Sequence, residues 1–393
     1  MTDLPAPPKD RPPRARLALR VATGLWVAAL AVIAIHIWLK PDSNTLFKTF
    51  RAGGTRWLAS ENLYPKVDEY IYSPFAAAFF APFALLPNRI GGILWRALSV
   101  AVYAGAIAAW LRKLGNVPVE RSALAWSFLL PLSLGDIFNG QANPLVIGLL
   151  MWAVLACRRE RWLLAALCVS VATYFKVYPL AMGLLLAVLH PRKFPLRLAV
   201  ALAFIFGLSM VLQRPGYVLA QYGNWVASLR QDPRRTLNYF GTYRDFWLLL
   251  RVLRIPISMQ GWAFLQATSG AALAILLYVV QRRGTDAEKL DLILLALGTC
   301  WMLLFGPATE SSTYVILAPP LALAWLHWRG ETKYFNGAAV CYALLLGSQM
   351  LSSWGHQYQN PYTHLIQPIA TILLAGTMLA YARRPSSLVL HPS

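Results

Sequence analysis

Residues 162–190 read WLLAALCVSVATYFKVYPLAMGLLLAVLH, and this stretch indicates the fold class. Two continuous apolar runs, at about 162–176 and 177–190, meet at a single cation, Lys176. The hydrocarbon core of a bilayer is ~30 Å thick and takes roughly 20 apolar residues of helix. A transmembrane β-strand would instead alternate apolar and polar residues over ~10-residue segments. The stretch therefore predicts membrane helices, some of them short or broken, which is tolerated where they line a protein or water-filled cavity.

The rest of the chain repeats this pattern. Of its 393 residues, 58% are hydrophobic and 13% are charged, whereas a soluble domain carries about 25% charged residues. This composition argues against a soluble globular enzyme and excludes a disordered chain. We predict an all-α polytopic membrane protein, with further apolar blocks at about 21–39, 72–87, 90–111, 142–157, 195–213, 260–280, 288–305, 313–328, 335–352 and 364–382.

The charge of the loops between these blocks sets their orientation. The chain has 36 Lys and Arg against 16 Asp and Glu, a net charge of +20. In a soluble protein this excess would suggest a nucleic-acid partner, but most basic residues here lie in short loops, where positive charge marks the cytoplasmic side. We therefore predict no nucleic-acid partner. The loops placed inside carry Arg158/Arg159/Arg161, Arg192/Lys193/Arg197, Arg282/Arg283/Lys289, Arg329/Lys333 and Arg383/Arg384.

Alternation of inner and outer loops predicts about 12 crossings with both termini inside. The block at 72–87, which contains Pro74, Pro82 and Pro87, breaks this alternation, so we expect it to be re-entrant or only partly spanning. The predicted organisation is a basic cytosolic tail at 1–20, a single transmembrane domain at 21–382 and a second cytosolic tail at 383–393.

Two predicted outer segments, 40–71 and 214–258, are too long to be turns. Both interleave apolar or aromatic residues with basic ones, a pattern typical of helices that lie in the membrane interface. Short polar clusters also follow the outer ends of other blocks. By the predicted topology, six clusters converge on one membrane face, at 42–44, 68–74, 136–144, 176–179, 238–245 and 306–312.

Lys176 is the most informative single residue in these clusters. A lysine between Phe175 and Val177, flanked by apolar runs, is costly unless it reaches water or an anion. Its side chain either extends to the interface or contacts a phosphate. Arg244 would add to such an anion site, because arginine grips phosphate bidentately. The pair Arg234/Arg235 would add to it too, or would instead attract anionic lipid headgroups.

The cysteines and histidines predict neither disulfides nor metal. All four cysteines lie in apolar blocks and form no CxxC, and the six histidines lack metal-ligand spacing. His36, within the first span, is interpreted as an interface or core histidine. We expect no metal and no cofactor.

Six motifs in chain order resemble a known family. They are Asn62-Leu63-Tyr64-Pro65, Tyr70-Ile71-Tyr72-Ser73-Pro74-Phe75, Pro82-Phe83-Ala84-Leu85-Leu86-Pro87, Gly140-Gln141-Ala142-Asn143, Lys176-Val177-Tyr178-Pro179 and the segment Gly306 to Pro320. Together they resemble the polyprenol-phosphate-mannose-dependent α-mannosyltransferases, bacterial integral-membrane glycosyltransferases of the GT-C type. The resemblance covers roughly residues 40–325.

The resemblance implies a fold and a reaction. The fold would be a GT-C-type bundle of about 12 transmembrane helices in the bacterial plasma membrane. The reaction would move a hexose, mannose in this family, from a polyprenyl-phosphate carrier to a lipid or glycan hydroxyl on the outer face, with inversion. An Asp in the first outer loop would be the base, and Lys176 with an outer-loop arginine such as Arg244 would hold the phosphate. The other residues expected to bind substrate are Tyr70, Tyr72, Asn139, Gln141, Asn143, Tyr178, Tyr243 and Glu310.

The chain departs from the family at the catalytic acid. When the chain is aligned with the family's motif from Tyr64 towards the N-terminus, Leu46 stands at the position of the family's Asp. Asp42 is the nearest acid and our first candidate for the general base, and Glu69 is the second. Other acids on the same face are Asp68, Asp136 and Glu310, and each is alternatively a solvated or capping group. If none of them serves as base, activity is lost.

Two other functions stay open at this point. A polyprenyl-phosphate or lipid transporter would use the same basic residues and interfacial helices, and the missing aligned Asp favours it. A non-catalytic partner in envelope assembly would need no acid at all. Loss of sugar transfer on substitution of Asp42 or Glu69, with lipid binding kept, would favour the enzyme.

Overall fold

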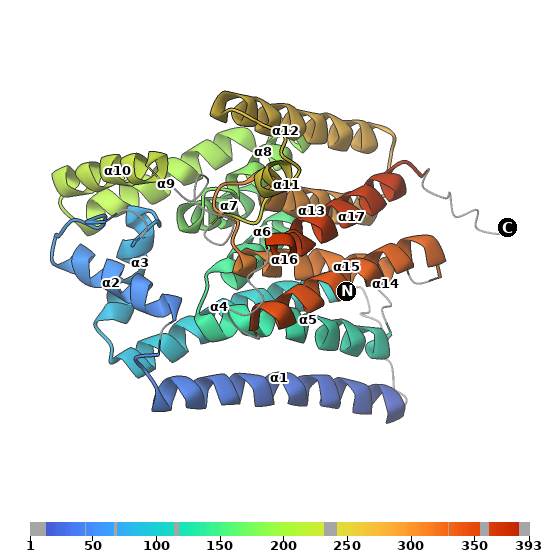
Figure 1. The fold of residues 1–393 in the computed structure, drawn as a ribbon, viewed down its shortest axis with the longest axis horizontal. Coiled ribbons are helices and arrows are strands. Elements are labelled where there is room, and N and C mark those ends of the chain that lie inside the picture. The colour runs from blue at the N-terminus through green and yellow to red at the C-terminus, as the bar shows by residue number, and fades with distance from the viewer. Residues whose placement is uncertain are drawn as a thin grey trace, which may run out of the picture.

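The computed structural model describes residues 13–43, 45–66, 69–113, 118–231, 242–328, 330–353 and 361–384, and is helical throughout with no strand in these ranges (Figure 1). The helices are α1 (Pro13–Leu39), α2 (Leu46–Leu58), α3 (Pro74–Ala84), α4 (Asn88–Lys113), α5 (Val119–Asn139), α6 (Asn143–Arg158), α7 (Trp162–Phe175), α8 (Leu180–Leu189), α9 (Pro195–Leu212), α10 (Pro215–Arg230), α11 (Phe246–Val252), α12 (Met259–Arg282), α13 (Ala287–Phe305), α14 (Ala318–His327), α15 (Thr332–Ser353), α16 (Pro361–His364) and α17 (Ile366–Ala382), with a 3₁₀ helix η2 (Ser311–Leu317) before α14. The predicted all-α class is confirmed.

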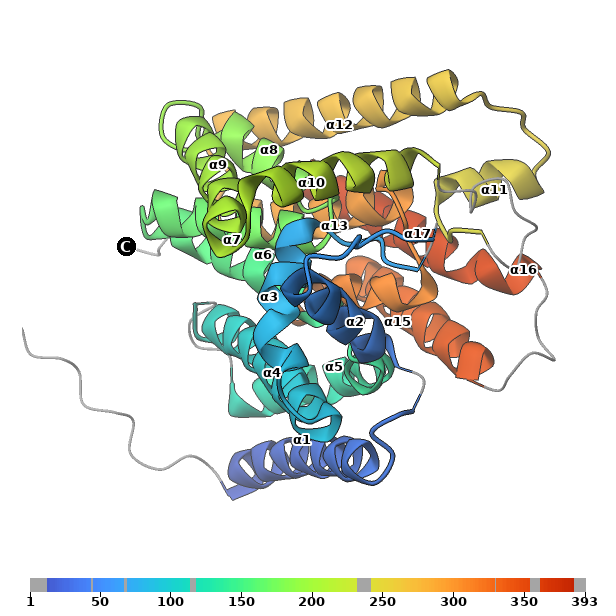
Figure 2. The same ribbon diagram turned by 90° about the vertical axis from the view of Figure 1, so that its left-hand side faces the viewer.

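Five helical segments in the described ranges are long and apolar enough to cross a membrane. They are Arg16–Leu39, Asn88–Lys113, Pro195–Leu212, Met259–Arg282 and Tyr362–Ala382. Shorter apolar helices, among them α6, α7 and α8, supply much of the interior. The count of about 12 crossings stays a prediction. Helices α1 and α12 run along opposite edges of the bundle (Figures 1 and 2).

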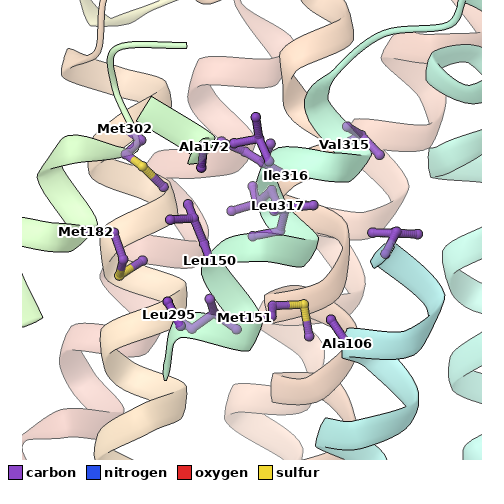
Figure 3. Packing of buried hydrophobic residues seen from close by; sticks show 14 of the residues in the cluster. Ala106, Leu150, Met151, Ala172, Met182, Leu295, Met302, Val315, Ile316 and Leu317 are labelled. Carbon is purple, nitrogen blue, oxygen red and sulfur yellow. The ribbon is translucent and has the colours of Figure 1, made fainter. Parts of the chain in front are cut away.

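The centre of the bundle is built from helices that are buried on all sides. Almost every residue of α6 and α13 is buried, as expected for a helix that is hydrophobic all round. The apolar cluster that contains Leu150, Met182, Leu295 and Leu317 joins α6, α8, α13 and η2 (Figure 3). The segment that follows α13 therefore enters the middle of the protein. This segment contains the polar cluster at 306–312.

A three-residue ion cluster ties one end of the bundle together. The carboxylate of Asp291, at the start of α13, accepts hydrogen bonds from Lys113 at the end of α4 and from Nε of Arg158 at the end of α6, the latter at 2.7 Å. Arg158 also donates to the carbonyl of Ala287. The loops that follow α4 and α6 thus meet the loop that precedes α13.

Further contacts bring the other basic loops to this same end. Nζ of Lys193 donates to Glu160 at 3.3 Å, and Nζ of Lys289 donates to the carbonyl of Arg384 at 2.8 Å. Arg384 in turn pairs with Glu331. All five loops that their charge placed on the inner side therefore lie at one end of the helices.

At the opposite end, α2 packs against protein through its apolar face. Phe47, Phe50 and Trp57 are buried there, and the rings of Phe50 and Phe80 stack with centroids 4.3 Å apart. A Cβ on Gly54 would lie 2.7 Å from the carbonyl oxygen of Phe80, so only glycine allows this approach. The amphipathic pattern at 40–71 thus serves packing onto α3, because the same spacing suits a protein partner as well as a lipid surface.

Helix α3 begins and ends at this same end of the bundle. It has 11 residues, or about 16 Å at 1.5 Å per residue, roughly half of a hydrocarbon core. At its start, the Ser73 hydroxyl donates to the carbonyl of Tyr174, at the end of α7. Just after it, the Asn88 side chain donates to Pro41 and to Asp42, which follow α1. Helix α3 alone is therefore too short to cross the bilayer, and the re-entrant or partly spanning path of 72–87 stays a prediction.

Candidate functional site

A cavity of about 390 Å³ opens at the end opposite the basic loops. It brings together five of the residues that the sequence singled out, from four separate segments, namely Tyr72, Lys176, Tyr178, Tyr243 and Glu310. The remaining lining residues are Ile71, Phe175, Val177, Trp225, Leu229, Arg230, Met259, Pro307 and Ala308.

The turn between α7 and α8 supplies the centre of this cavity. Helix α7 ends at Phe175, and Lys176 adopts an extended backbone. Pro179 lies three residues further on and disfavours helical geometry at Tyr178, the residue before it. The apolar run is therefore interrupted, and two polar side chains are presented there. Nζ of Lys176 lies 5.9 Å from the ring centroid of Tyr178.

Behind Tyr178 lies a buried chain of hydrogen bonds. The Tyr178 hydroxyl donates to Oδ1 of Asn143 at 3.3 Å, and Nδ2 of Asn143 donates to Oδ1 of Asp136 at 2.8 Å. The side chain of Asp136 is buried, with a relative exposure of 3%. Lys176 and Glu310 both lie within electrostatic reach of Asp136. The cavity wall is therefore a connected network, and Asp136, although it was weighed as a candidate base, stands behind the cavity.

The turn between α5 and α6 holds this network in place. Gly140 ends α5 with φ +69°, and its carbonyl accepts a hydrogen bond from Nε1 of Trp95 at 2.7 Å. Arg96, buried in α4, donates to the carbonyls of Ile137 and Phe138 at 3.0 and 2.7 Å. These carbonyls form the negative end of the α5 dipole, which stabilises a cation. Arg96 was not among the residues predicted from the sequence, although an arginine inside an apolar block was the available signal.

We expect Gly140→Ala to destabilise the protein by about 1–2 kcal/mol, the cost of a left-handed conformation for a residue with a Cβ. The added Cβ would also lie 3.0 Å from Nη2 of Arg96. Thermal unfolding in detergent measures the effect. Gly135→Ala is the matched control in α5, because nothing lies within 4 Å of its Cβ position. Equal melting temperatures for the two variants would show that the turn tolerates a side chain.

Glu310 is held by a reciprocal cap at the start of η2. Its side chain accepts a hydrogen bond from the backbone N–H of Thr313, and its own backbone N–H donates to Oγ1 of Thr313 at 3.1 Å. Such a capping box fixes the direction of the N-cap side chain. Glu310 is the one carboxylate residue of the described ranges that lines the cavity.

Among the described residues, the arginine that lines the cavity is Arg230, at the end of α10. Arg244 instead ties loops together, because its Nη1 donates to Ser311 at 3.0 Å and to Gln367 at 3.1 Å. Burial lowers the pKa of Arg244 from its ordinary value. Within the described ranges, the cationic residues in the cavity wall are therefore Lys176 and Arg230. The sequence did not distinguish Arg230 from its neighbours.

The two acids proposed as catalytic lie away from the cavity wall. Asp42 accepts a hydrogen bond from Nδ2 of Asn88 at 2.9 Å, at the corner between α1 and α4. Glu69 forms an ion pair with Arg56 of α2 on the surface. Neither residue lines the cavity. Asp68 lies outside the described residues, as do Arg234 and Arg235.

Three other predicted binding residues do not line the cavity. Oδ1 of Asn139 accepts a hydrogen bond from the backbone N–H of Leu46 at 3.2 Å. Gln141 is buried beside the Gly140 turn. Tyr70 is buried behind Tyr72, with ring centroids 5.6 Å apart, and burial raises its pKa well above the ordinary value.

A second cavity, of about 560 Å³, adjoins the first. It lies between α8, α12 and α13 and is almost entirely apolar. Val177, Tyr178 and Pro307 line both cavities. Further lining residues include Leu184, Val188, Ala267, Ala271, Leu273 and Trp301. The polar cavity therefore continues into an apolar groove along the exposed helix α12.

These features define a class of protein, a helical membrane protein with an ionisable cavity beside an apolar groove. Residues 70–307 match glycosyltransferase family 87, and the chain belongs to this family. The family resemblance of the sequence motifs is thereby confirmed.

Two curated relatives are similar to part of the chain. Both are named polyprenol-phosphate-mannose-dependent alpha-(1-2)-phosphatidylinositol pentamannoside mannosyltransferase. The one from Mycobacterium tuberculosis is 31% identical over 116 residues, which is 28% of this chain and 26% of the relative. The one from Mycolicibacterium smegmatis is 30% identical over 118 residues, or 29% of this chain and 28% of the relative. The match thus spans about a quarter of each relative.

Proposed function

We propose that this protein is a membrane glycosyltransferase that moves a hexose, in the first place mannose, from a polyprenyl-phosphate carrier to a hydroxyl of a lipid or glycan. The observation that carries the proposal is the continuity of the two cavities through Val177, Tyr178 and Pro307. A substrate with a charged head and a long apolar tail fits such a pair of cavities. Membership of family 87 and the names of the two relatives support the same reaction.

In this proposal, Lys176 and Arg230 bind the carrier phosphate. Both line the polar cavity, and hydrogen bonds between these cations and phosphate oxygens are charge-assisted. The charged form of a lysine in an apolar surrounding is stabilised most by an anionic partner. The same two cations would stabilise the phosphate as it leaves the sugar.

The apolar groove takes the isoprenoid tail, and the aromatic residues take the sugar. The groove volume of about 560 Å³ lies within the range of roughly 300–1,000 Å³ that is usual for small-molecule sites. Tyr72, Tyr243 and Trp225 line the polar cavity, where their rings would pack against a sugar. The carrier delivers the sugar already activated, so we propose no cofactor.

We further propose a GT-C-type arrangement of about 12 crossings with the cavity on the outer face. The proposal rests on the basic loops at the opposite end, since positive loops mark the cytoplasmic side. Residues 21–382 would then form one transmembrane domain between cytosolic tails at 1–20 and 383–393. The enzyme would act in the bacterial plasma membrane, where its partners are the lipid-linked donor and a lipid or glycan acceptor.

The test is transfer of radiolabelled sugar into extracted lipid or glycan by membranes that contain the protein. Polyprenyl-phosphate-mannose and the corresponding glucose and arabinose carriers are supplied separately, with membranes lacking the protein as control. We expect transfer from the mannose carrier. Binding of polyprenyl phosphate without transfer from any carrier would favour the transporter, and absence of both would favour the assembly partner.

The groove assignment predicts that Ala267→Trp weakens binding of long carriers. Ala267 lines the groove, and an indole there would displace part of the tail from it. Loss of burial for about two CH₂ groups, at roughly 0.8 kcal/mol each, corresponds to about 1.6 kcal/mol, or roughly tenfold in KM. A carrier of only two isoprene units should be unaffected.

Ile275→Trp is the control for this substitution, because Ile275 lies on α12 but faces outward, with 63% of its surface exposed. It should leave KM unchanged for both carriers. Equal KM values for Ala267→Trp and the unsubstituted protein with the long carrier would place the tail elsewhere.

A further inference from the structure

We propose that Glu310 is the general base of the transfer, in place of an acid in the first outer segment. This inference rests on the proposed function. It starts from the position of Glu310, the carboxylate residue of the described ranges that shares a cavity wall with Lys176 and Arg230. A general base must lie within reach of the acceptor hydroxyl, and that hydroxyl must approach the sugar inside this cavity.

Three other acids near this end are engaged at different places. Asp42 binds Asn88, and Glu69 pairs with Arg56. Asp245 is buried and caps α11 by accepting a hydrogen bond from the N–H of Leu248 at 3.2 Å. None of these three carboxylates lines the cavity.

Asp136 is the closest competitor, but its setting suits a positioning role. Its carboxylate accepts a hydrogen bond from Asn143, which in turn accepts one from Tyr178. Because Asp136 does not line the cavity, it would act through Tyr178 and through its electrostatic interaction with Lys176. It would thus orient the cavity wall without touching the acceptor.

The backbone around Glu310 is fixed before substrate binds. The carbonyl of Thr309 accepts a hydrogen bond from the backbone N–H of Arg244 at 2.8 Å, and the Tyr314 hydroxyl donates to the carbonyl of Arg244 at 2.6 Å. Thr313 completes the cap on Glu310 itself. A base held in this way needs little reorganisation as the acceptor arrives.

The chemical step balances with these groups alone. The Glu310 carboxylate takes the proton of the acceptor hydroxyl, whose oxygen forms a bond to C1 of the sugar. The bond between C1 and the phosphate oxygen breaks, and its electron pair stays on the phosphate. Polyprenyl phosphate leaves with one more negative charge, which Lys176 and Arg230 stabilise. The proton on Glu310 then passes to water.

The experiment compares Glu310→Gln with Asp42→Asn, Glu69→Gln and Asp136→Asn in the transfer assay with full-length protein in membranes. Glutamine keeps an oxygen that can cap Thr313 but cannot take a proton. We expect kcat of Glu310→Gln to fall by about 10²–10⁴-fold, the usual worth of a positioned base, with the donor KM changed by less than about threefold. Asp42→Asn and Glu69→Gln should lose less than about tenfold in kcat.

Thr313→Val controls for damage to the cap. It removes Oγ1, the acceptor of the Glu310 backbone N–H, but keeps the carboxylate, so it should keep at least about a tenth of the activity. A loss in Thr313→Val as large as in Glu310→Gln would mean that Glu310 acts only as a cap. Partial recovery of kcat in Glu310→Asp would support the base.

The outcomes separate this inference from the proposed function. If the unsubstituted protein transfers no sugar, the proposed function fails, and the assignment of Glu310 as general base fails with it. If it transfers sugar and Glu310→Gln keeps its rate while Asp42→Asn or Asp136→Asn loses it, the inference fails and the function stands.

Discussion

Lys176→Met should reduce kcat for sugar transfer by about 10²–10³-fold, the usual cost of removing one preorganised group that stabilises a developing negative charge. Methionine keeps the length and apolar character of the side chain but removes the charge that faces the cavity. The same variant should bind polyprenyl phosphate more weakly by roughly tenfold or more, because a hydrogen bond to a charged group contributes about 1.5–3 kcal/mol. Transfer kinetics and displacement of a labelled carrier measure the two effects.

Lys193→Met is the matched control for Lys176→Met. Lys193 is a lysine at the opposite end of the bundle, where it pairs with Glu160. Its removal should leave transfer and carrier binding unchanged. If Lys176→Met behaves like this control, the side chain of Lys176 merely extends to the interface, and the phosphate site lies elsewhere.

Replacement of Asp291 by Ala should be the most destabilising single change at the other end of the molecule. The Asp291 side chain is only 8% exposed and holds both Lys113 and Arg158. Removal of one partner of a buried ion pair costs about 3–5 kcal/mol. Since Lys113 and Arg158 keep 21% and 31% of their side-chain exposure, water screens part of the loss, and we expect about 2–3 kcal/mol.

Thermal unfolding in detergent checks this prediction, with Glu160→Gln as the comparison. Glu160 also pairs with a lysine, but its side chain is 71% exposed, so its loss should cost less than about 1 kcal/mol. A melting temperature of Asp291→Ala close to that of Glu160→Gln would show that the ion cluster does not hold the helix ends together.

The fold class and the arrangement of the two ends were predictable because they depend on local patterns. The apolar runs at 162–176 and 177–190 became α7 and α8, and the Lys176 to Pro179 turn between them became the centre of the cavity. The basic residues in short loops predicted that these loops lie on one side, and the loops do lie at one end of the bundle. Such features depend on the hydropathy and backbone preferences of neighbouring residues, which the sequence displays directly.

Features that depend on tertiary contacts were harder to predict. The spacing of Phe47, Phe50 and Trp57 is the same whether a helix meets lipid or protein, so the packing of α2 onto α3 was not visible. The sequence ranked Asp42 and Glu69 ahead of the other acids, and only the fold placed Glu310 in the cavity wall. In the same way, the sequence singled out Arg244 for the phosphate, and only the fold showed that α10 brings Arg230 to the cavity wall.

The groove along α12 has a consequence for how the enzyme is supplied. Its wall is built from an exposed helix at the edge of the bundle (Figure 2). Under the proposed function, a lipid carrier would therefore enter and leave sideways, by diffusion within the bilayer plane. The turnover rate would then depend on the mole fraction of carrier among the surrounding lipids. It would not depend on the volume of water around the membrane. Dilution of vesicles with buffer would leave the rate unchanged, whereas dilution of the carrier with inert phospholipid would slow it.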